Sequence, residues 1–294
     1  MTNATSAYPN VYRTVTARIS ESILAGAKEF EMPWHSIFGG MPINAATKAE
    51  YRGINVLSLW VQAQIAGFAS SHWASYRQWS SLGAQVRKGE KGTLIIFYKE
   101  LGDEQQEDGA LKFVARSSFV FNSAQVEGWR PPDVERHSEA LVLEEVDSFV
   151  RATHAIIWHG SEMARYRRGD DRIDMPDRSA FKATKTRSAT ESYYAVLLHE
   201  LVHWSGASQR LNREFGEKFG DKAYAFEELI AELGSAFLCA KLGVSNEPRA
   251  DHAAYVASWL EILQRDHRAI FAAARCAQDA AEYLIDLVAA RTYG

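Results

Sequence analysis

The chain has 294 residues, of which 47% are hydrophobic and 24% charged, and its formal net charge is −4. No stretch approaches the roughly 18 consecutive apolar residues that a membrane helix needs. The N-terminus has neither the basic flank nor the apolar core of a secretory signal. Cys239 and Cys276 stand alone in apolar helical segments, which indicates free thiols. We therefore expect a cytoplasmic protein with one large domain or two of ordinary size.

Charge is unevenly distributed along the chain. Residues 1–130 hold 13 Lys and Arg against 11 Asp and Glu, whereas the remainder holds 20 against 26. Within residues 44–99, seven basic side chains stand against two acidic ones. This difference in charge indicates that the two halves have different functions.

The first half of the chain mixes helical and strand patterns. Apolar residues at Val11, Val15, Ile19 and Ile23 repeat with a helical period. Prolines and glycines then interrupt any period and predict a long loop. In chain order we expect a helix over 11–30, the loop over 31–53, helices over 54–68 and 73–83, a strand over 93–100, a polar connection over 101–110 and a strand or strand pair over 111–122.

The second half is predicted to be mainly helical. The polar segment "WRPPDVERHSEA" contains two prolines and no period, so it is the best candidate for a linker. We expect a helix over 141–153, short strands over 154–160 and 171–176, and helices over 190–204, 222–242, 250–266 and 268–290. The predicted fold class is α+β in two domains, residues 1–128 and 141–294, joined by the linker 129–140. We expect a fragment ending near residue 130 to fold alone.

The segment "LLHELVHWSG" places two histidines four residues apart in an apolar run. Residues i and i+4 project from one face of a helix, so His199 and His203 can bind one metal ion. Glu200 then lies beside a metal-bound water whose pKa zinc lowers toward ~7, and it can accept the proton of that water. A chance match is improbable, because burying two histidines and a glutamate without partners is costly.

A third metal ligand must come from elsewhere in the chain. The longer pattern HExxHxxGxxH matches through Gly206, but Gln209 occupies the last ligand position. The next helical segment, "YAFEELIAELGSAFL", offers Glu228 and Glu232 on one face, with Glu227 on a different one. We favour Glu228 as the ligand and Glu232 as a partner that orients a ligand histidine. The reverse assignment stays open, as does a solvated role for both.

Long motifs in both halves resemble one protein family. "YYAVLLHELVHWSGASQRL" with "YAFEELIAELGSAFL" resembles the zincin-like metallopeptidase domain of ArdC-type antirestriction proteins and related polyvalent proteins. "PWHSIFGGMPINAATKAEYRGINVLSLW" with "WASYRQWSSLGAQVRKGEKGT" resembles their N-terminal single-stranded-DNA-binding domain, which plasmid primases share. The resemblance implies a plasmid-borne protein that binds single-stranded DNA and protects incoming DNA from restriction. It also implies metal ligation by His199 and His203, with Glu200 at the position of the base.

The basic segment in the first half has the composition of a single-strand binder. Such proteins combine a basic groove with aromatic side chains on which bases stack, and the glycines of "RKGEKG" would let a cationic turn approach phosphates. The alternative is that several aromatics belong to the core, as Trp60 does, and that the basic residues form an ordinary solvated face. The candidate DNA-binding residues are Lys48, Tyr51, Arg52, Trp73, Tyr76, Arg77, Trp79, Arg87, Lys88 and Lys91.

Three functions are compatible with these patterns. The first is an antirestriction protein that acts by binding single-stranded DNA. The second is a working metallopeptidase, whose target could be a host restriction component and whose DNA binding only localises it. The third is a non-catalytic protein that uses the zincin fold as a scaffold; an intact Glu200 disfavours it, since a scaffold needs only the ligands. The expected ion is Zn²⁺, with Mn²⁺ as the alternative, because a His/His/Glu site accepts both.

Overall fold

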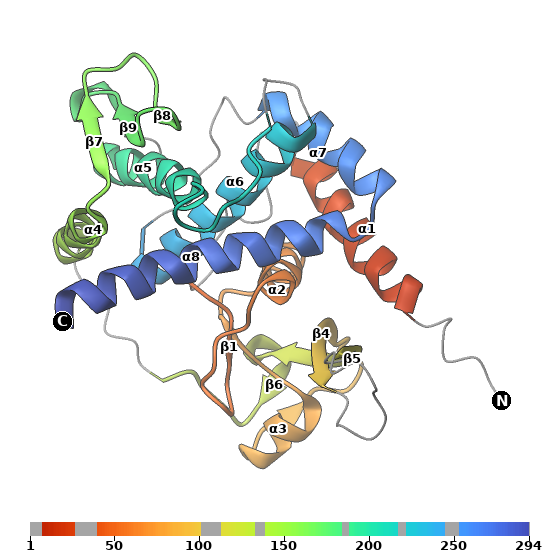
Figure 1. Ribbon diagram of the computed structural model, residues 1–294. Coiled ribbons are helices and arrows are strands. Elements are labelled where there is room, and N and C mark those ends of the chain that lie inside the picture. The colour runs from red at the N-terminus through yellow and green to blue at the C-terminus, as the bar shows by residue number, and fades with distance from the viewer. Residues whose placement is uncertain are drawn as a thin grey trace.

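The structure is a computed structural model that describes residues 8–26, 40–100, 113–132, 139–183, 188–216, 222–244 and 253–293. It confirms the mixed α+β fold class, with most strands in the first half and most helices in the second (Figure 1). In the part of the chain so described, no helix is long and apolar enough to cross a membrane. Cys239 and Cys276 are both free thiols.

The N-terminal half forms a small sheet flanked by helices. Its elements are α1 (Tyr8–Gly26), β1 (Ile43–Asn44), α2 (Ile54–Ala66), β2 (His72–Ala74), α3 (Tyr76–Ser81), β3 (Gln85–Val86), β4 (Thr93–Glu100), β5 (Phe113–Asn122) and β6 (Val126–Glu127). The main sheet has the order β1-β2-β5-β4, and β3 pairs separately with β6. Strands β4 and β5 form a long antiparallel ladder from Thr93↔Val120 to Glu100↔Phe113.

The predicted helix over 73–83 starts later than its sequence suggested. Residues 72–74 form strand β2, whose Trp73 and Ala74 pair with β5. Ser75 then caps α3 by accepting a hydrogen bond from the Gln78 amide, and the Gln78 side chain accepts one from the Ser75 amide. This capping box fixes the start of the helix at Tyr76. The preceding Trp73, an aromatic residue of high β propensity, lies in the sheet instead.

In its described residues, the C-terminal half consists of five α-helices and a three-stranded sheet that lies beside one of them (Figure 1). Its elements are α4 (Glu139–Thr153), β7 (Ile156–His159), β8 (Arg165–Arg167), β9 (Arg172–Met175), α5 (Ala189–Ser205), α6 (Lys222–Leu242), α7 (Ala253–Arg265) and α8 (Ala269–Tyr293). In the order β7-β9-β8, β9 is parallel to β7 and antiparallel to β8. Strand β8 was not predicted, because its arginine-rich sequence lacks an apolar alternation. Helix α6 packs against α5 and α8.

The largest hydrophobic core crosses the predicted domain boundary. It contains Ile19 and Ile23 from α1 and Trp60 from α2, together with Phe237 from α6 and many other C-terminal residues. Trp60 lies 5.7 Å from Phe237, measured between ring centroids. Helix α1 runs beside α7, and the long helix α8 lies between the N-terminal sheet and the rest of the C-terminal half (Figure 1). Half of the predicted linker 129–140, residues 133–138, lies outside the described residues.

Candidate functional site

The HExxH segment lies in the second half of α5, where that helix faces α6. Ser188 caps α5 with a reciprocal capping box to Glu191, and the helix then stays buried from Tyr193 onward except at Val196. Gly234 of α6 permits the close approach of the two helices, because a Cβ there would lie 3.0 Å from both Val202 methyl carbons. The sequence thus places His199, Glu200 and His203 inside the protein.

Two histidines and a glutamate converge between these helices. His199 Nε2 and His203 Nε2 lie 3.2 Å apart, and each is 3.5 Å from an oxygen of Glu228. Donor atoms bound to zinc at about 2.1 Å in a tetrahedron lie roughly 3.4 Å from one another. The His199, His203 and Glu228 side chains are all buried, and their ligand atoms lie within 4.8 Å of one another. Their spacing and chemistry therefore fit a single divalent cation.

A second glutamate, Glu227, contacts the ring nitrogen of His203 that faces away from His199. His203 Nδ1 donates to Glu227 Oε1 at 3.1 Å, which leaves Nε2 for the cluster. Arg213 in turn donates to both Glu227 oxygens, at 3.0 and 2.8 Å, and to the Val202 carbonyl at 2.6 Å. Partners of this kind fix the ring orientation of a ligand histidine and its tautomer. Neither residue was predicted from the sequence: the helical spacing put Glu227 on a different face from Glu228 and Glu232, and no pattern singles out Arg213.

Glu232 takes the corresponding place near His199. Its Oε2 lies 3.7 Å from His199 Nδ1, so the two side chains are adjacent but longer than hydrogen-bond distance apart. The structure therefore brings Glu232 to the side of His199 that faces away from Glu228. The orienting role that the sequence predicted for Glu232 remains a prediction, and Glu227 takes the equivalent role for His203.

The electrostatics of the cluster favour a bound positive charge. Burial disfavours an imidazolium, but the carboxylates of Glu228 and Glu227 outweigh it and raise the pKa of His203 to about 10. Burial likewise opposes ionisation of Glu228, yet His203 and His199 hold the pKa of that carboxyl well below its usual range. A pocket in which buried carboxylates face two imidazoles stabilises a cation, whether a proton or a metal ion.

Glu200 differs from the other glutamates of the site. It is 4% exposed, and among the described residues its carboxylate has no hydrogen-bond or ion-pair partner. The other three site glutamates each lie within 4.0 Å of a histidine nitrogen. A buried carboxylate that has no protein partner and lies next to a candidate metal site has the placement expected of a base that acts on water.

The turn that follows the motif explains both Gly206 and Gln209. A Cβ at position 206 would lie 2.7 Å from the Arg213 side chain and 2.8 Å from that of Phe215, so a larger residue would have to displace these side chains. Gln209 instead points away and donates to Asp171 Oδ2 at 3.0 Å. The residue at the last ligand position of the extended motif therefore forms a hydrogen bond at the surface and does not face the histidines. Arg213, four residues later, contacts the site through Glu227.

The basic residues of the N-terminal half are exposed, but not all are available for a ligand. Arg87 donates to Glu90 and to the Ala124 carbonyl, at 2.7 and 2.6 Å, and so holds the turn that contains Lys88 and Lys91. Arg52 pairs with Glu282 of α8. Lys48, Arg77, Lys88 and Lys91 are exposed. The turn thus presents its two lysines, while its arginine has a structural role.

The structure corrects the assignment of the aromatic side chains. Trp73 and Trp79 are 1% and 0% exposed, so neither can present a ring face to a base. They fill two small cores of the N-terminal half. Tyr51 is partly buried, and its hydroxyl accepts a hydrogen bond from Asn44. Tyr76 stays 51% exposed and is the predicted aromatic that remains on the surface.

An exposed aromatic side chain that was not predicted from the sequence lies next to the basic turn. Phe119 of β5 is 57% exposed, and its Cβ would lie 2.9 Å from a Cβ placed on Gly92. Gly92 directly follows Lys91, so the ring borders the turn that carries Lys88 and Lys91. The alternation of "SSFVFN" marks Phe119 and Val120 as opposite faces, but the sequence does not say which face is covered.

Comparisons with known proteins match the two halves separately. Residues 9–130 match the family described as the N-terminal domain of anti-restriction factor ArdC, and residues 144–276 match a zincin-like metallopeptidase family. The chain is 39% identical to the crystallised antirestriction protein ArdC from plasmid R388, and the comparison covers 95% of this chain and 98% of that one. The TM-scores are 0.77 for its metal-free structure and 0.76 for its Mn(II)-bound structure. The chain belongs to the ArdC antirestriction family.

Two further relatives match more than nine-tenths of this chain. Protein y4eC of Sinorhizobium fredii is 44% identical over 286 residues, covering 94% of this chain and 91% of that protein. DNA primase TraC of Escherichia coli is 33% identical over 296 residues, which are 93% of this chain but 27% of the primase. This ArdC-family chain therefore spans about a quarter of the primase. The comparisons confirm the two-domain architecture, with an ArdC N-terminal domain followed by a zincin-like domain.

Proposed function

We propose that this protein binds single-stranded DNA through its N-terminal domain and, by occupying it, protects incoming DNA from host restriction. Membership of the ArdC family supports the antirestriction role. The similarity to a DNA primase supports contact with DNA. The observation in this chain that carries the single-strand part is the position of Phe119, which borders the turn bearing Lys88 and Lys91.

The physical reason for a single-stranded ligand lies in that combination. The lysines of the turn can neutralise phosphates, and release of their counterions drives nucleic-acid binding. An exposed ring offers a stacking surface, which unpaired bases can use because they are not already stacked in a duplex. Tyr76 supplies a second exposed ring in the same domain. The surface therefore offers both components of a single-strand binder.

The zincin-like domain is proposed to hold one divalent ion on His199, His203 and Glu228. Zn²⁺ is the ion we favour, and Mn²⁺ is the alternative because a related ArdC protein was crystallised with Mn(II). When bound, such an ion polarises a carbonyl and lowers the pKa of a bound water. Glu200 is then placed to take a proton, Glu227 to orient His203, and Arg213 to hold Glu227.

A second function is supported by one observation. Glu200 keeps a buried carboxylate beside the cluster without a protein partner among the described residues, and a purely structural metal site has no need of it. An active metallopeptidase that cleaves a protein target, such as a restriction component, would use this group. In that case DNA binding serves only to bring the peptidase to its place of action.

The deciding experiment measures restriction protection in cells beside DNA affinity in vitro. Lys88→Glu with Lys91→Glu should weaken both, whereas Arg87 is left intact because it holds the turn. The matched control is Lys182→Glu with Lys222→Glu, two exposed lysines of the other domain. Phe119→Ala should weaken single-strand binding about ten-fold or more, since one stacked base contributes roughly 1–3 kcal/mol. The Phe119→Ala variant should keep the melting temperature of the wild type.

The Glu200→Gln variant separates the two functions. If occupancy protects DNA, this variant should protect nearly as well as the wild type. If proteolysis protects DNA, protection should collapse, because loss of a general base lowers the rate by ~10²–10⁴. That second result, in a variant that still folds, carries metal and binds DNA, would replace our proposal with the peptidase.

A further inference from the structure

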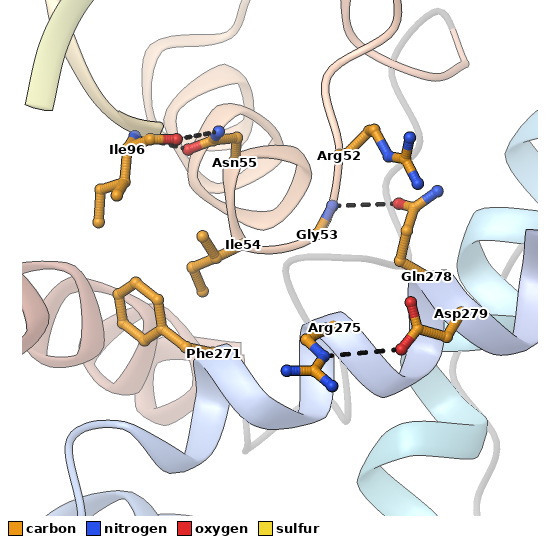
Figure 2. Close-up of a pocket in the computed structure, with 9 residues that line it drawn as sticks. All are labelled: Arg52, Gly53, Ile54, Asn55, Ile96, Phe271, Arg275, Gln278 and Asp279. Carbon is orange, nitrogen blue, oxygen red and sulfur yellow. Dashed lines mark hydrogen bonds and ion pairs between the residues drawn. The ribbon is translucent and has the colours of Figure 1, made fainter. Parts of the chain in front are cut away.

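A pocket of about 670 Å³ lies between the N-terminal domain and helix α8, away from the HExxH cluster. Its walls come from the start of α2, the middle of β4 and the first half of α8, so neither half of the chain forms it alone (Figure 2). Figure 2 shows that its apolar and charged residues lie on opposite sides. The pocket is therefore amphipathic.

The apolar side is made by Ile54, Ile96 and Phe271. These three come from α2, β4 and α8, and their side chains point toward the same space (Figure 2). Each is at least nine-tenths buried, so their positions are set by the surrounding core. A flat, weakly polar group such as a nucleobase can be covered by a wall of this kind.

The charged side carries two arginines. Arg52 pairs with Glu282, and its side chain is 66% exposed. Arg275 is 83% exposed and lies 3.7 Å from Asp279, beyond hydrogen-bond distance. Exposed ion pairs of this type contribute little stability and exchange readily. A phosphate can therefore compete with either carboxylate for its arginine, because a guanidinium group matches the geometry of a phosphate better than an ammonium group does.

The pocket walls are fixed before any ligand arrives. Asn55 donates to the Ile96 carbonyl at 2.6 Å and accepts from the Ile96 amide at 2.8 Å, which ties α2 to β4. The Gln278 side chain accepts from the Gly53 amide at 3.0 Å, which ties α8 to the start of α2. Gly53 has φ +53°, a conformation that favours glycine. A preformed site loses less entropy on binding.

We infer that this pocket binds one nucleotide of the single-stranded DNA, with the base against the apolar side and a phosphate on the charged side that carries Arg52 and Arg275. The inference rests on the proposed DNA binding and extends it to a residue of the zincin-like domain. Strand β4 begins two residues after Lys91 and reaches the pocket at Ile96. At about 3.3 Å per residue, the five residues from Lys91 to Ile96 span roughly 16 Å. One DNA strand can therefore contact both sites.

The test uses the full chain and two matched ion pairs. Arg275→Gln and Asp279→Asn alter the pocket, whereas Arg265→Gln and Glu261→Gln alter an exposed i,i+4 pair on α7. Fluorescence anisotropy with labelled oligothymidylate, measured over a range of salt, gives the affinity of each. Arg275→Gln should weaken binding about five-fold and reduce the slope of log K against log salt by about 0.7, the value of one phosphate contact. Asp279→Asn should tighten binding, because it removes a competing anion.

The control variants distinguish failure of the pocket inference from failure of the proposed function. Changes at Arg265 and Glu261 should alter affinity less than two-fold. If the pocket variants behave like these controls while the wild type binds DNA and depends on Lys88 and Lys91, the pocket inference is wrong and the proposed function stands. If the wild type binds no single-stranded DNA, the proposed function fails, and the pocket inference fails with it.

Discussion

The two halves of the molecule place polar and aromatic side chains in opposite ways. The C-terminal half buries its functional ionisable groups, with His199, His203 and Glu228 enclosed between α5 and α6. The N-terminal half buries its tryptophans and leaves its lysines and Phe119 on the surface. A buried charge is costly and so points to a ligand, whereas a buried tryptophan is ordinary core. The same degree of burial thus argues for function in one half and against it in the other.

The halves also differ in how self-contained they are. The two cores that lie wholly within the N-terminal half contain six and four buried residues. The large core contains most of the C-terminal helices and also takes in Ile19, Ile23 and Trp60. The Tyr12 ring lies 4.6 Å from that of Phe271, and Thr16 donates to the His267 carbonyl at 2.7 Å. Separate functions therefore share one packed interior.

The largest expected effect follows from cutting that shared core. A fragment that ends near residue 130 would expose the apolar faces of α1 and α2 that now meet α7, α8 and Phe237. The shared core reverses the expectation, drawn from the sequence, that such a fragment folds alone. We now expect it to lack a cooperative unfolding transition and to bind a hydrophobic dye, in contrast to the full chain. Thermal unfolding followed by circular dichroism measures the transition. A fragment that melts cooperatively and binds DNA like the full chain would show that the domains fold independently.

Metal removal should give the next largest effect and act on the other half. A ligand present at 100 to 1,000 times its dissociation constant stabilises the folded state by about 3–4 kcal/mol. A chelator should therefore lower the unfolding free energy of the wild type by this order but leave His203→Ala unchanged, because that variant has already lost the ion. His154→Asn is the control, since His154 is exposed and asparagine tolerates its φ of +56°. Equal metal content in His203→Ala and the wild type would refute the assigned site.

Much of this arrangement could be predicted from the sequence because it depends on local periodicity. The long helices and the β4–β5 ladder lie where apolar spacing placed them. The spacing of His199 and His203 was sufficient to put both on one helix face, and the structure places Glu228 beside them. Features that depend on one element alone are visible in the sequence.

Features that depend on packing between elements were not visible. Glu227 and Arg213 are fourteen residues apart and meet only because the chain turns after Gly206. Trp79 and Phe119 are both aromatic residues of the N-terminal half, yet one is buried and the other exposed. Sequence composition cannot assign the covered face of a short strand or helix, since that depends on its neighbours.

The smallest expected effect concerns a buried carboxylate that does not serve the metal cluster. The Asp174 side chain of β9 is 2% exposed, and Arg172 donates to it at 2.8 Å. Burial opposes its ionisation, but Arg172, Arg165 and Arg167 outweigh this effect and hold the pKa of Asp174 below the ordinary value of 3.8. Because the pKa is lower in the folded state, the stabilisation is present above pH 3.8 and is lost as the pH falls toward the folded pKa.

Asp174→Asn should therefore be less stable than the wild type near pH 7, by about 1 kcal/mol, since the arginines are partly exposed and solvent screens them. The difference should shrink at acidic pH, once the pH falls through the lowered pKa and the wild-type carboxyl also becomes neutral. Urea unfolding at both pH values measures it, and a chelator should leave the difference unchanged, unlike the effect at His203. A difference that persists at low pH, or that disappears with the chelator, would mean that Asp174 stabilises the fold by some means other than these arginines.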